Sequence, residues 1–131
     1  MQASKTIEAL AKVRPHGTTW PSEAALRLAI EAALRNLGIR FLCRPASAAG
    51  VTELLVDSAP NLLMVISLSG DWQKIVAAAA QICIDQKALP LARPVIVLGS
   101  PPSPVALKDA LAQLDFILIE CFGPITCPGG A

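Results

Sequence analysis

The run Leu62–Leu68 constrains the fold of this chain more than any other feature of the sequence. It carries no charged residue and closes at Ser69 and Gly70. A continuous apolar run of strand length is typical of an interior strand that is covered on both faces, whereas a strand with one wet face alternates apolar and polar residues. We therefore expect Leu62–Leu68 to form the centre of a sheet with helices on both sides.

Two segments with helical periodicity flank this run. The first is Ser22–Leu37, which follows Pro21, ends before Gly38 and repeats apolar residues at positions 26, 29, 30, 33, 34 and 37. Ser is a preferred N-cap, and Gly commonly follows the last residue of a helix. The second is Asp71–Ala88, with Asp71 as the predicted N-cap. Each segment has a wide apolar side, so both are expected to pack on the sheet.

The remaining segments are shorter. The sequence predicts a β-type run at Ile39–Cys43, a loop at Pro45–Gly50, a buried strand at Pro94–Leu98, a surface turn at Ser100–Pro104, a short helix at Val105–Leu114 and a final strand at Phe116–Cys121. The opening segment from Ser4 is expected to form a helix that Pro15 and Gly17 stop, with a strand at Ile7–Val13 as the alternative. Val51–Asp57 fits either a strand or the end of a helix.

These elements predict one α/β domain over residues 1–131, with residues 123–131 as a flexible tail. A chain of this length has room for a single hydrophobic core. Helices and strands alternate in the second half, which favours a mostly parallel sheet with helices on both faces. The expected architecture is a three-layer α/β/α sandwich around a central mixed or mostly parallel sheet.

Composition narrows the classes of function. The chain is 53% hydrophobic and 16% charged, with a mean hydropathy of +0.55, which excludes a disordered protein and favours a protein partner or homo-oligomer. Aromatic residues make up 4% and Tyr is absent, so recognition of single strands by base stacking is disfavoured. No segment approaches the roughly 20 apolar residues of a membrane helix, and the start lacks a signal pattern. We expect a cytoplasmic protein without membrane association.

Most common catalytic motifs are absent from the sequence. There is no G-x-x-x-x-G-K-[ST] phosphate loop, and the only histidine, His16, makes a Ser-His-Asp triad improbable. The cysteines show no C-x-x-C spacing and are expected to be buried thiols; they are Cys43, Cys83, Cys121 and Cys127. A disulfide or half of a metal site between the last two is the alternative, and no zinc site is predicted.

The order of the predicted elements resembles the restriction-endonuclease-like, or PD-(D/E)XK, superfamily. Its members carry a helix with a Glu, a strand with an acidic residue, a strand with (D/E)-x-K, then a helix and a strand. Over about residues 4 to 72 the chain is similar to very-short-patch repair endonucleases, through Ser4, Thr19, Pro21, Glu23, Leu26, Arg27, Gly38 and Phe41. The resemblance implies Mg²⁺-assisted phosphodiester hydrolysis by carboxylates and a Lys.

Carried over by position, the resemblance assigns a degenerate active site. Glu23 matches the helix Glu, and either Glu53 or Asp57 matches the acidic residue of the second strand. The Glu and Lys of (D/E)-x-K fall on Ser67 and Ser69, where neutral hydroxyls replace both charges. The resemblance therefore implies a nuclease fold without activity and without a cofactor.

Two further expectations accompany this assignment. The alternative to an inactive site is that Lys74 in the following helix replaces the missing Lys, and Mg²⁺ would bind only if activity remained. The candidate phosphate contacts are four cations of the first third of the chain, for which an ordinary solvated surface is the alternative interpretation. These cations are Lys12, Arg14, Arg40 and Arg44.

A second resemblance is to response-regulator receiver domains, which have a flavodoxin-like fold. It rests on Ala33–Gly70 and Pro94–Leu98. The phospho-acceptor Asp would fall on Val65 or Ile66, the Thr on Gly99 and the Lys on Glu120 or Cys127, so every catalytic position is lost. This alternative implies a pseudo-receiver that binds proteins without phosphorylation. Ile7–Arg14 lacks the acidic pair at the end of a receiver's first strand, which favours the nuclease-like interpretation: an inactive, nucleic-acid-associated accessory or structural protein, with DNA as the expected partner.

Overall fold

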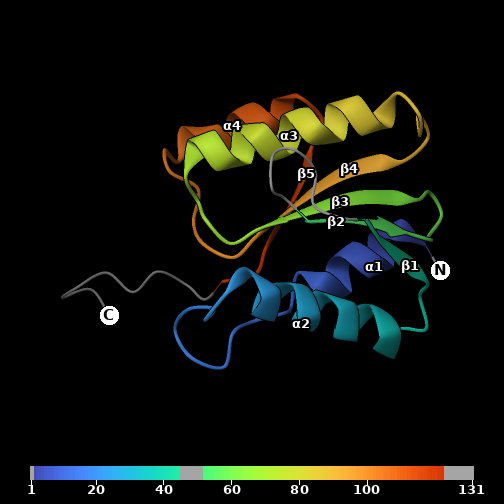
Figure 1. The fold of residues 1–131 in the computed structure, drawn as a ribbon, viewed down its shortest axis with the longest axis horizontal. Helices are drawn as coiled ribbons and strands as arrows, with labels where there is room; N and C mark the ends of the chain where they lie inside the picture. The colour runs from blue at the N-terminus through green and yellow to red at the C-terminus, as the bar shows by residue number, and fades with distance from the viewer. Residues whose placement is uncertain (1, 45–51, 123–131) are drawn as a thin grey trace.

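The computed structural model describes residues 2–44 and 52–122. The helices in these ranges are α1 (Ala3–Leu10), α2 (Glu23–Asn36), α3 (Trp72–Gln86) and α4 (Ala106–Gln113), and the strands are β1 (Phe41–Arg44), β2 (Thr52–Val56), β3 (Leu62–Ser67), β4 (Arg93–Leu98) and β5 (Ile117–Glu120). The fold is α/β, with α1 and α2 on one face of the sheet and α3 and α4 on the other (Figure 1). The predicted loop at Pro45–Gly50, the predicted tail at 123–131 and Cys127 lie outside the described residues.

The described strands form a five-stranded mixed sheet in the order β1-β2-β3-β4-β5. Its first half is an antiparallel meander, in which Cys43 pairs with Leu54 and Glu53 pairs with Val65. Its second half is parallel. The helices α3 and α4 return the chain to the border of the sheet at which β3 begins, so β4 and β5 run in the same direction as β3. The central position predicted for Leu62–Leu68 is confirmed: β3 lies in the middle of the sheet and all its residues are buried.

Alternation along β3 divides the apolar interior into two cores. Met64 and Ile66 face α1 and α2, where they meet Leu26 and Ile30. Their neighbours Leu63 and Val65 face α3 and α4. Successive side chains of a strand point to opposite faces, and burying each large aliphatic side chain contributes about 1.5–3 kcal/mol. The charge-free composition of β3 is therefore explained by contact with helices on both faces.

The ends of the long helices follow the capping residues seen in the sequence. Ser22 Oγ accepts a hydrogen bond from the Ala25 amide at 3.1 Å and begins α2. At the other end Gly38 has a φ of +72°, and the Ile39 amide donates to the Leu34 carbonyl at 3.0 Å, which is a Schellman motif. Asp71 caps α3 by accepting from the Gln73 amide at 3.4 Å.

The sequence left two segments undecided, and the structure distinguishes them. Val51–Asp57 contains β2, a strand with partners on both sides. The opening segment is the helix α1, so the alternative strand at Ile7–Val13 is wrong. Pairing with β1 and β3 decides the first case, because hydrogen bonds to two neighbouring strands satisfy the backbone of a short segment that has no strong preference of its own.

Two sequence-based expectations are corrected by the structure. Cys43 and Cys83 are exposed, because Cys43 lies on the edge strand β1 and Cys83 lies on the outer side of α3. The turn predicted at Ser100–Pro104 does lie at the surface, with Pro101, Ser103 and Pro104 exposed, and only Pro102 is buried. The turn packs on Gly70, whose carbonyl accepts from the Ser103 amide at 2.8 Å, and a Cβ atom at Gly70 would lie 1.8 Å from the Pro101 carbonyl oxygen.

Candidate functional site at the carboxyl edge of the sheet

Four of the five described strands have their C-terminal ends along the same border of the sheet. We call this border, which runs across the strand ends, the carboxyl edge. β3, β4 and β5 are parallel, and β1 has the same direction because it is separated from β3 by the antiparallel strand β2. α2 also begins here: a Cβ atom added to Gly99, just after β4, would lie 2.8 Å from Leu26 Cδ2. The carboxyl edge therefore gathers residues from both halves of the chain.

Ser67 and Ser69 build the turn that leads from β3 into α3. Ser67 is 3% exposed, and its hydroxyl donates to the Ser69 carbonyl at 3.0 Å. The Ser69 hydroxyl accepts from the Asp71 amide at 3.1 Å, next to the cap of α3. Both hydroxyls thus stabilise the turn, and neither supplies the negative or positive charge of a (D/E)-x-K pair.

Glu53 is the predicted acidic residue that lies near this turn. It is 5% exposed and pairs with Val65 of β3. Val65 precedes Ser67 by two positions on the same strand. Its side chain shares the α3 face of the sheet with Val65 and Ser67, since alternate residues share a face. Diagonal neighbours on paired strands are about 7–8 Å apart, so Glu53 and Ser67 are close but not in direct register.

Asp57 lies at the opposite edge of the sheet. It follows Val56, which pairs with the first residue of β3, whereas Ser67 is the last of that six-residue strand. A rise of about 3.3 Å per residue separates the two ends by roughly 17 Å. Asp57 therefore does not join Ser67, and of the two acidic candidates only Glu53 belongs to the carboxyl edge.

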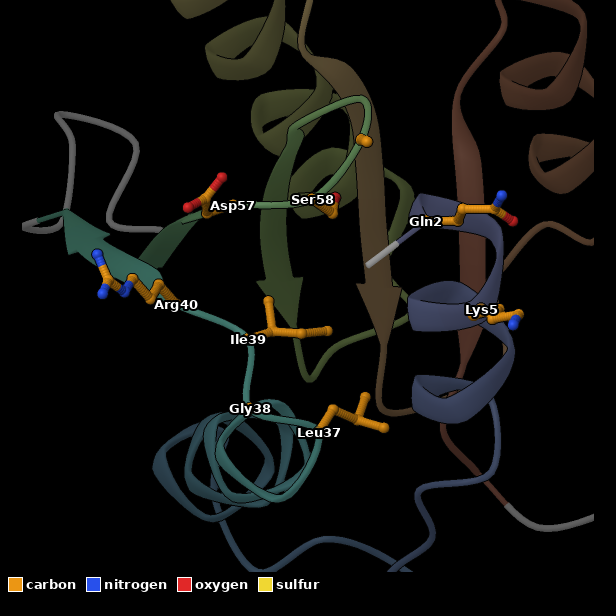
Figure 2. Close-up of a pocket in the computed structure, with 9 residues that line it drawn as sticks. Gln2, Lys5, Leu37, Gly38, Ile39, Arg40, Asp57 and Ser58 are labelled. Carbon is orange, nitrogen blue, oxygen red and sulfur yellow. The ribbon is translucent and has the colours of Figure 1, made fainter.

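Asp57 instead borders a hollow of about 800 Å³ between α1, the α2–β1 connection and the turn after β2. Figure 2 shows Leu37 and Ile39 extending toward α1, while the side chains of Gln2 and Lys5 point away on the far side of that helix. Arg40 and Asp57 lie at one side of the hollow, on neighbouring strand ends. The charged groups around this hollow do not converge on a common point.

Glu23 and Lys74 begin helices on opposite faces of the sheet. Glu23 is the first residue of α2, on the α1 and α2 side, and Lys74 is exposed in the first turn of α3. Glu23 is therefore separated by the sheet from the face that carries Glu53. Among residues 2–44 and 52–122, no group of three or more His, Cys, Asp or Glu side chains is arranged to hold a metal ion.

The candidate phosphate contacts divide between the two edges. Arg14 Nη1 donates to the carbonyls of Ala11 at 2.7 Å, Val13 at 2.8 Å and Glu120 at 3.1 Å, which joins the segment after α1 to the end of β5. Lys12 is exposed in the same segment. Arg44 ends β1 at the other side of the carboxyl edge, whereas Arg40 lies before β1, at the opposite edge beside Asp57.

Several contacts at the carboxyl edge had no signal in the sequence. Trp20 Nε1 donates to the Cys121 carbonyl at 2.7 Å across 101 positions. Arg14, His16, Thr19 and Trp20 border a hollow of about 390 Å³. Lys108 of α4 forms an ion pair with Glu120, and hydrogen bonding to that carboxylate raises the pKa of Lys108.

Cys121 is buried behind these residues. Its thiol donates to the Leu10 carbonyl at 3.4 Å, and burial raises the pKa of Cys121 to about 11. A thiol with a raised pKa is a poor nucleophile near neutral pH, because the thiolate is the reactive form. Cys121 is therefore part of the packing between α1 and β5.

No family model, curated protein or solved structure matches this chain. The described helices include none that is both long and apolar enough to cross a membrane.

Proposed function

We propose that this protein is a catalytically inactive nuclease-like domain that associates with nucleic acid as an accessory or structural protein. The main support for this proposal is the order of the elements around β3 together with the residue types at the end of that strand. A helix, three antiparallel strands, a helix and a parallel strand follow one another, and serines occupy the positions of the charged (D/E)-x-K pair. We further propose that the carboxyl edge contacts the nucleic acid.

The directions of the strands support a nuclease-like arrangement over a receiver-like one. Flavodoxin-like sheets, including those of receivers, have the strand order 2-1-3-4-5, with parallel strands joined by helices. Here neighbours in the sheet are also neighbours in the chain, and β2 is antiparallel to both β1 and β3. The pseudo-receiver interpretation therefore gains no support from the sheet.

The local bonding of Ser67 and Ser69 supports the absence of hydrolysis. Divalent cations in nucleases are held by converging carboxylates, and their charge stabilises the transition state. Both hydroxyls are neutral and already bonded within the turn, at 3.0 Å and 3.1 Å. Glu53 is the only carboxylate among Glu23, Glu53 and Asp57 that lies on the same face and at the same edge as Ser67.

The cations support a nucleic-acid contact at the carboxyl edge. Lys12 and Arg14 lie beside β5, and Arg44 lies at the end of β1. Strands are about 4.8 Å apart, so the five-stranded sheet separates these positions by roughly 19 Å. Phosphate contacts at both sides of this edge would fix the orientation of a duplex without reading its sequence.

Titration with a labelled DNA duplex at low and moderate salt, with Mg²⁺ present and product length followed, tests the proposal. We expect salt-sensitive binding and intact DNA, because the contacts are ionic and the charged metal site is lost. Cleavage that disappears in Glu53→Gln would overturn the claim of inactivity. Absence of binding at low salt would overturn the claim of nucleic-acid association.

Single-charge variants test the carboxyl edge. Lys12→Ala and Arg44→Ala should each weaken binding and reduce the slope of log K against log salt by about 0.9. Arg40→Ala removes the same charge at the opposite edge and is the matched control. An equal loss in Arg40→Ala would contradict the assignment of the surface while leaving DNA binding itself intact.

A further inference from the structure

The composition of α3 does not match its surroundings. Residues Val76–Ile84 carry no charge at all. Only Ile75, Ala78 and Ile82 of this helix are buried against the sheet. A helix that is apolar on all sides is normally covered on all sides, and surface helices carry polar residues on the outer side. The outer side of α3 therefore lacks a cover within the described chain.

The exposed apolar residues form one continuous line, which we call the α3 stripe: Trp72, Val76, Ala80, Cys83 and Ile84. Trp72 is 50% exposed, Val76 44% and Ile84 62%. Residues spaced three or four apart lie on one side of a helix, so the stripe follows the whole length of α3. Figure 1 shows α3 as an outermost element, with α4 beside it and no helix or strand over its outer side.

The two ends of the stripe are complementary to each other. Trp72 begins it, and the exposed Lys87 follows at its other end, four residues after Cys83. An ammonium group over an indole ring is favourable, whereas two ammonium groups facing each other repel. In an antiparallel pair of α3 helices each Trp72 would face Lys87 of the partner subunit. A parallel pair would place Lys87 against Lys87 of the partner subunit.

We propose that the α3 stripe is the interface of a homodimer in which α3 packs antiparallel on α3 of a second copy. A two-fold axis generates this arrangement, because each copy contributes the same surface. The axis passes between Ala79 and Ala80, the midpoint of Trp72 and Lys87, and small side chains there allow the close approach of two helices. Val76 then packs beside Cys83 of the partner subunit.

Disulfide trapping tests the position of the axis. Ala80→Cys is introduced together with Cys43→Ser, Cys83→Ser and Cys127→Ser, and the buried Cys121 is retained. We expect mild oxidation to yield a covalent dimer, because position 80 meets position 80 of the second copy. Ala24→Cys, an exposed alanine of α2, is the matched control and should stay monomeric. Equal trapping at both positions, or none at position 80, would overturn the proposal.

Sedimentation of charge variants tests the direction of the helices. Trp72→Lys places like charges opposite Lys87 of the partner subunit, whereas Trp72→Glu places opposite charges there. Both lose the ring, so the antiparallel dimer predicts at least tenfold weaker association for Trp72→Lys than for Trp72→Glu. Equal weakening would contradict the antiparallel arrangement, since a parallel pair sets position 72 against itself. A wild-type chain that stays monomeric at every concentration would exclude the dimer altogether.

Discussion

The two long helices, α2 and α3, cover opposite faces of the sheet and differ on their outer sides. The inner sides are alike: Leu26, Ile30 and Leu34 of α2 are buried, as are Ile75, Ala78 and Ile82 of α3. On the flank of α2, Glu31 pairs with Arg27 at 3.3 Å and with Arg35 at 3.5 Å. Arg35 also lies 5.3 Å from the centre of the Phe41 ring. The α3 stripe has no such pairs.

This difference separates the requirements of folding from those of association. Packing on the sheet needs one apolar side on each helix, and both helices provide it. The ion pairs of α2 lie on its flank, and Leu28 is the only exposed large apolar residue of this helix. Isolated exposed apolar residues are common, whereas contiguous apolar patches usually mark a contact surface. We therefore expect the outer side of α2 to face water and the outer side of α3 to contact a partner.

The largest expected effect is on the free energy of unfolding, when a buried side chain is removed from the inner side of either helix. Ile30→Ala in α2 and Ile82→Ala in α3 should each lower the free energy of unfolding by about 2–5 kcal/mol, because each removes a fully buried aliphatic side chain and leaves a cavity. Urea denaturation of the monomer measures both. A loss confined to one variant would mean that one helix contributes little to the core.

A smaller effect distinguishes the thiols on the two sides of the sheet. Cys121 belongs to the core under α1 and α2, and its pKa is raised to about 11 by burial. The unfolded thiol ionises near 9, so the folded protein loses stability as pH rises from 9 toward 11. The loss should reach about 2 kcal/mol and be absent from Cys121→Ala.

Alkylation provides the control for this thiol comparison. At pH 8, Cys83 on the outer side of α3 should react quickly in the monomer, and Cys121 should not react. Rapid labelling of Cys121 in the folded protein would contradict its placement under α1. Slower labelling of Cys83 at high protein concentration would agree with a dimer through the α3 stripe.

The smallest effect concerns the ion pairs of α2. Glu31→Gln should lower the free energy of unfolding by about 0.5–1 kcal/mol at low salt, because Arg27 and Arg35 lose their charged partner. The difference from wild type should shrink only in part in high salt, because Arg35 is exposed to ions whereas the Glu31 side chain is 11% exposed. Thermal denaturation at two salt concentrations measures it. Salt independence would show that the polar contacts of Glu31, rather than its charge, stabilise the helix.

Much of the fold was predictable from single segments. The caps Ser22 and Asp71 begin the long helices as expected, and the central strand lies where its charge-free run placed it. β2 was undecided because a short apolar segment becomes a strand only when other strands pair with it. The exposure of Cys83 was missed because an apolar sequence gives no sign of which side of a helix remains uncovered.

The candidate site was predictable only as a set of residue types. The replacement of (D/E)-x-K by Ser67 and Ser69 is visible in the sequence, but the bonding of both hydroxyls within one turn is not. The cations Lys12, Arg14, Arg40 and Arg44 were proposed together, yet Arg40 lies at the other edge. Sheet order separates them, because the direction of each strand decides the edge at which its neighbours lie.

The sequence by itself determined the local structure of most segments: where the two long helices begin and end, and which strand is buried on both faces. Capping bonds and side-chain periodicity act over a few residues, so they can be identified without the rest of the chain. Only the tertiary structure decided which residues that are distant in the sequence lie next to each other. The bonds from Trp20 to Cys121 and from Arg14 to Glu120 span 101 and 106 positions. Such contacts depend on strand order and direction, which in turn determine the residues that gather at the carboxyl edge and the side of α3 that stays uncovered.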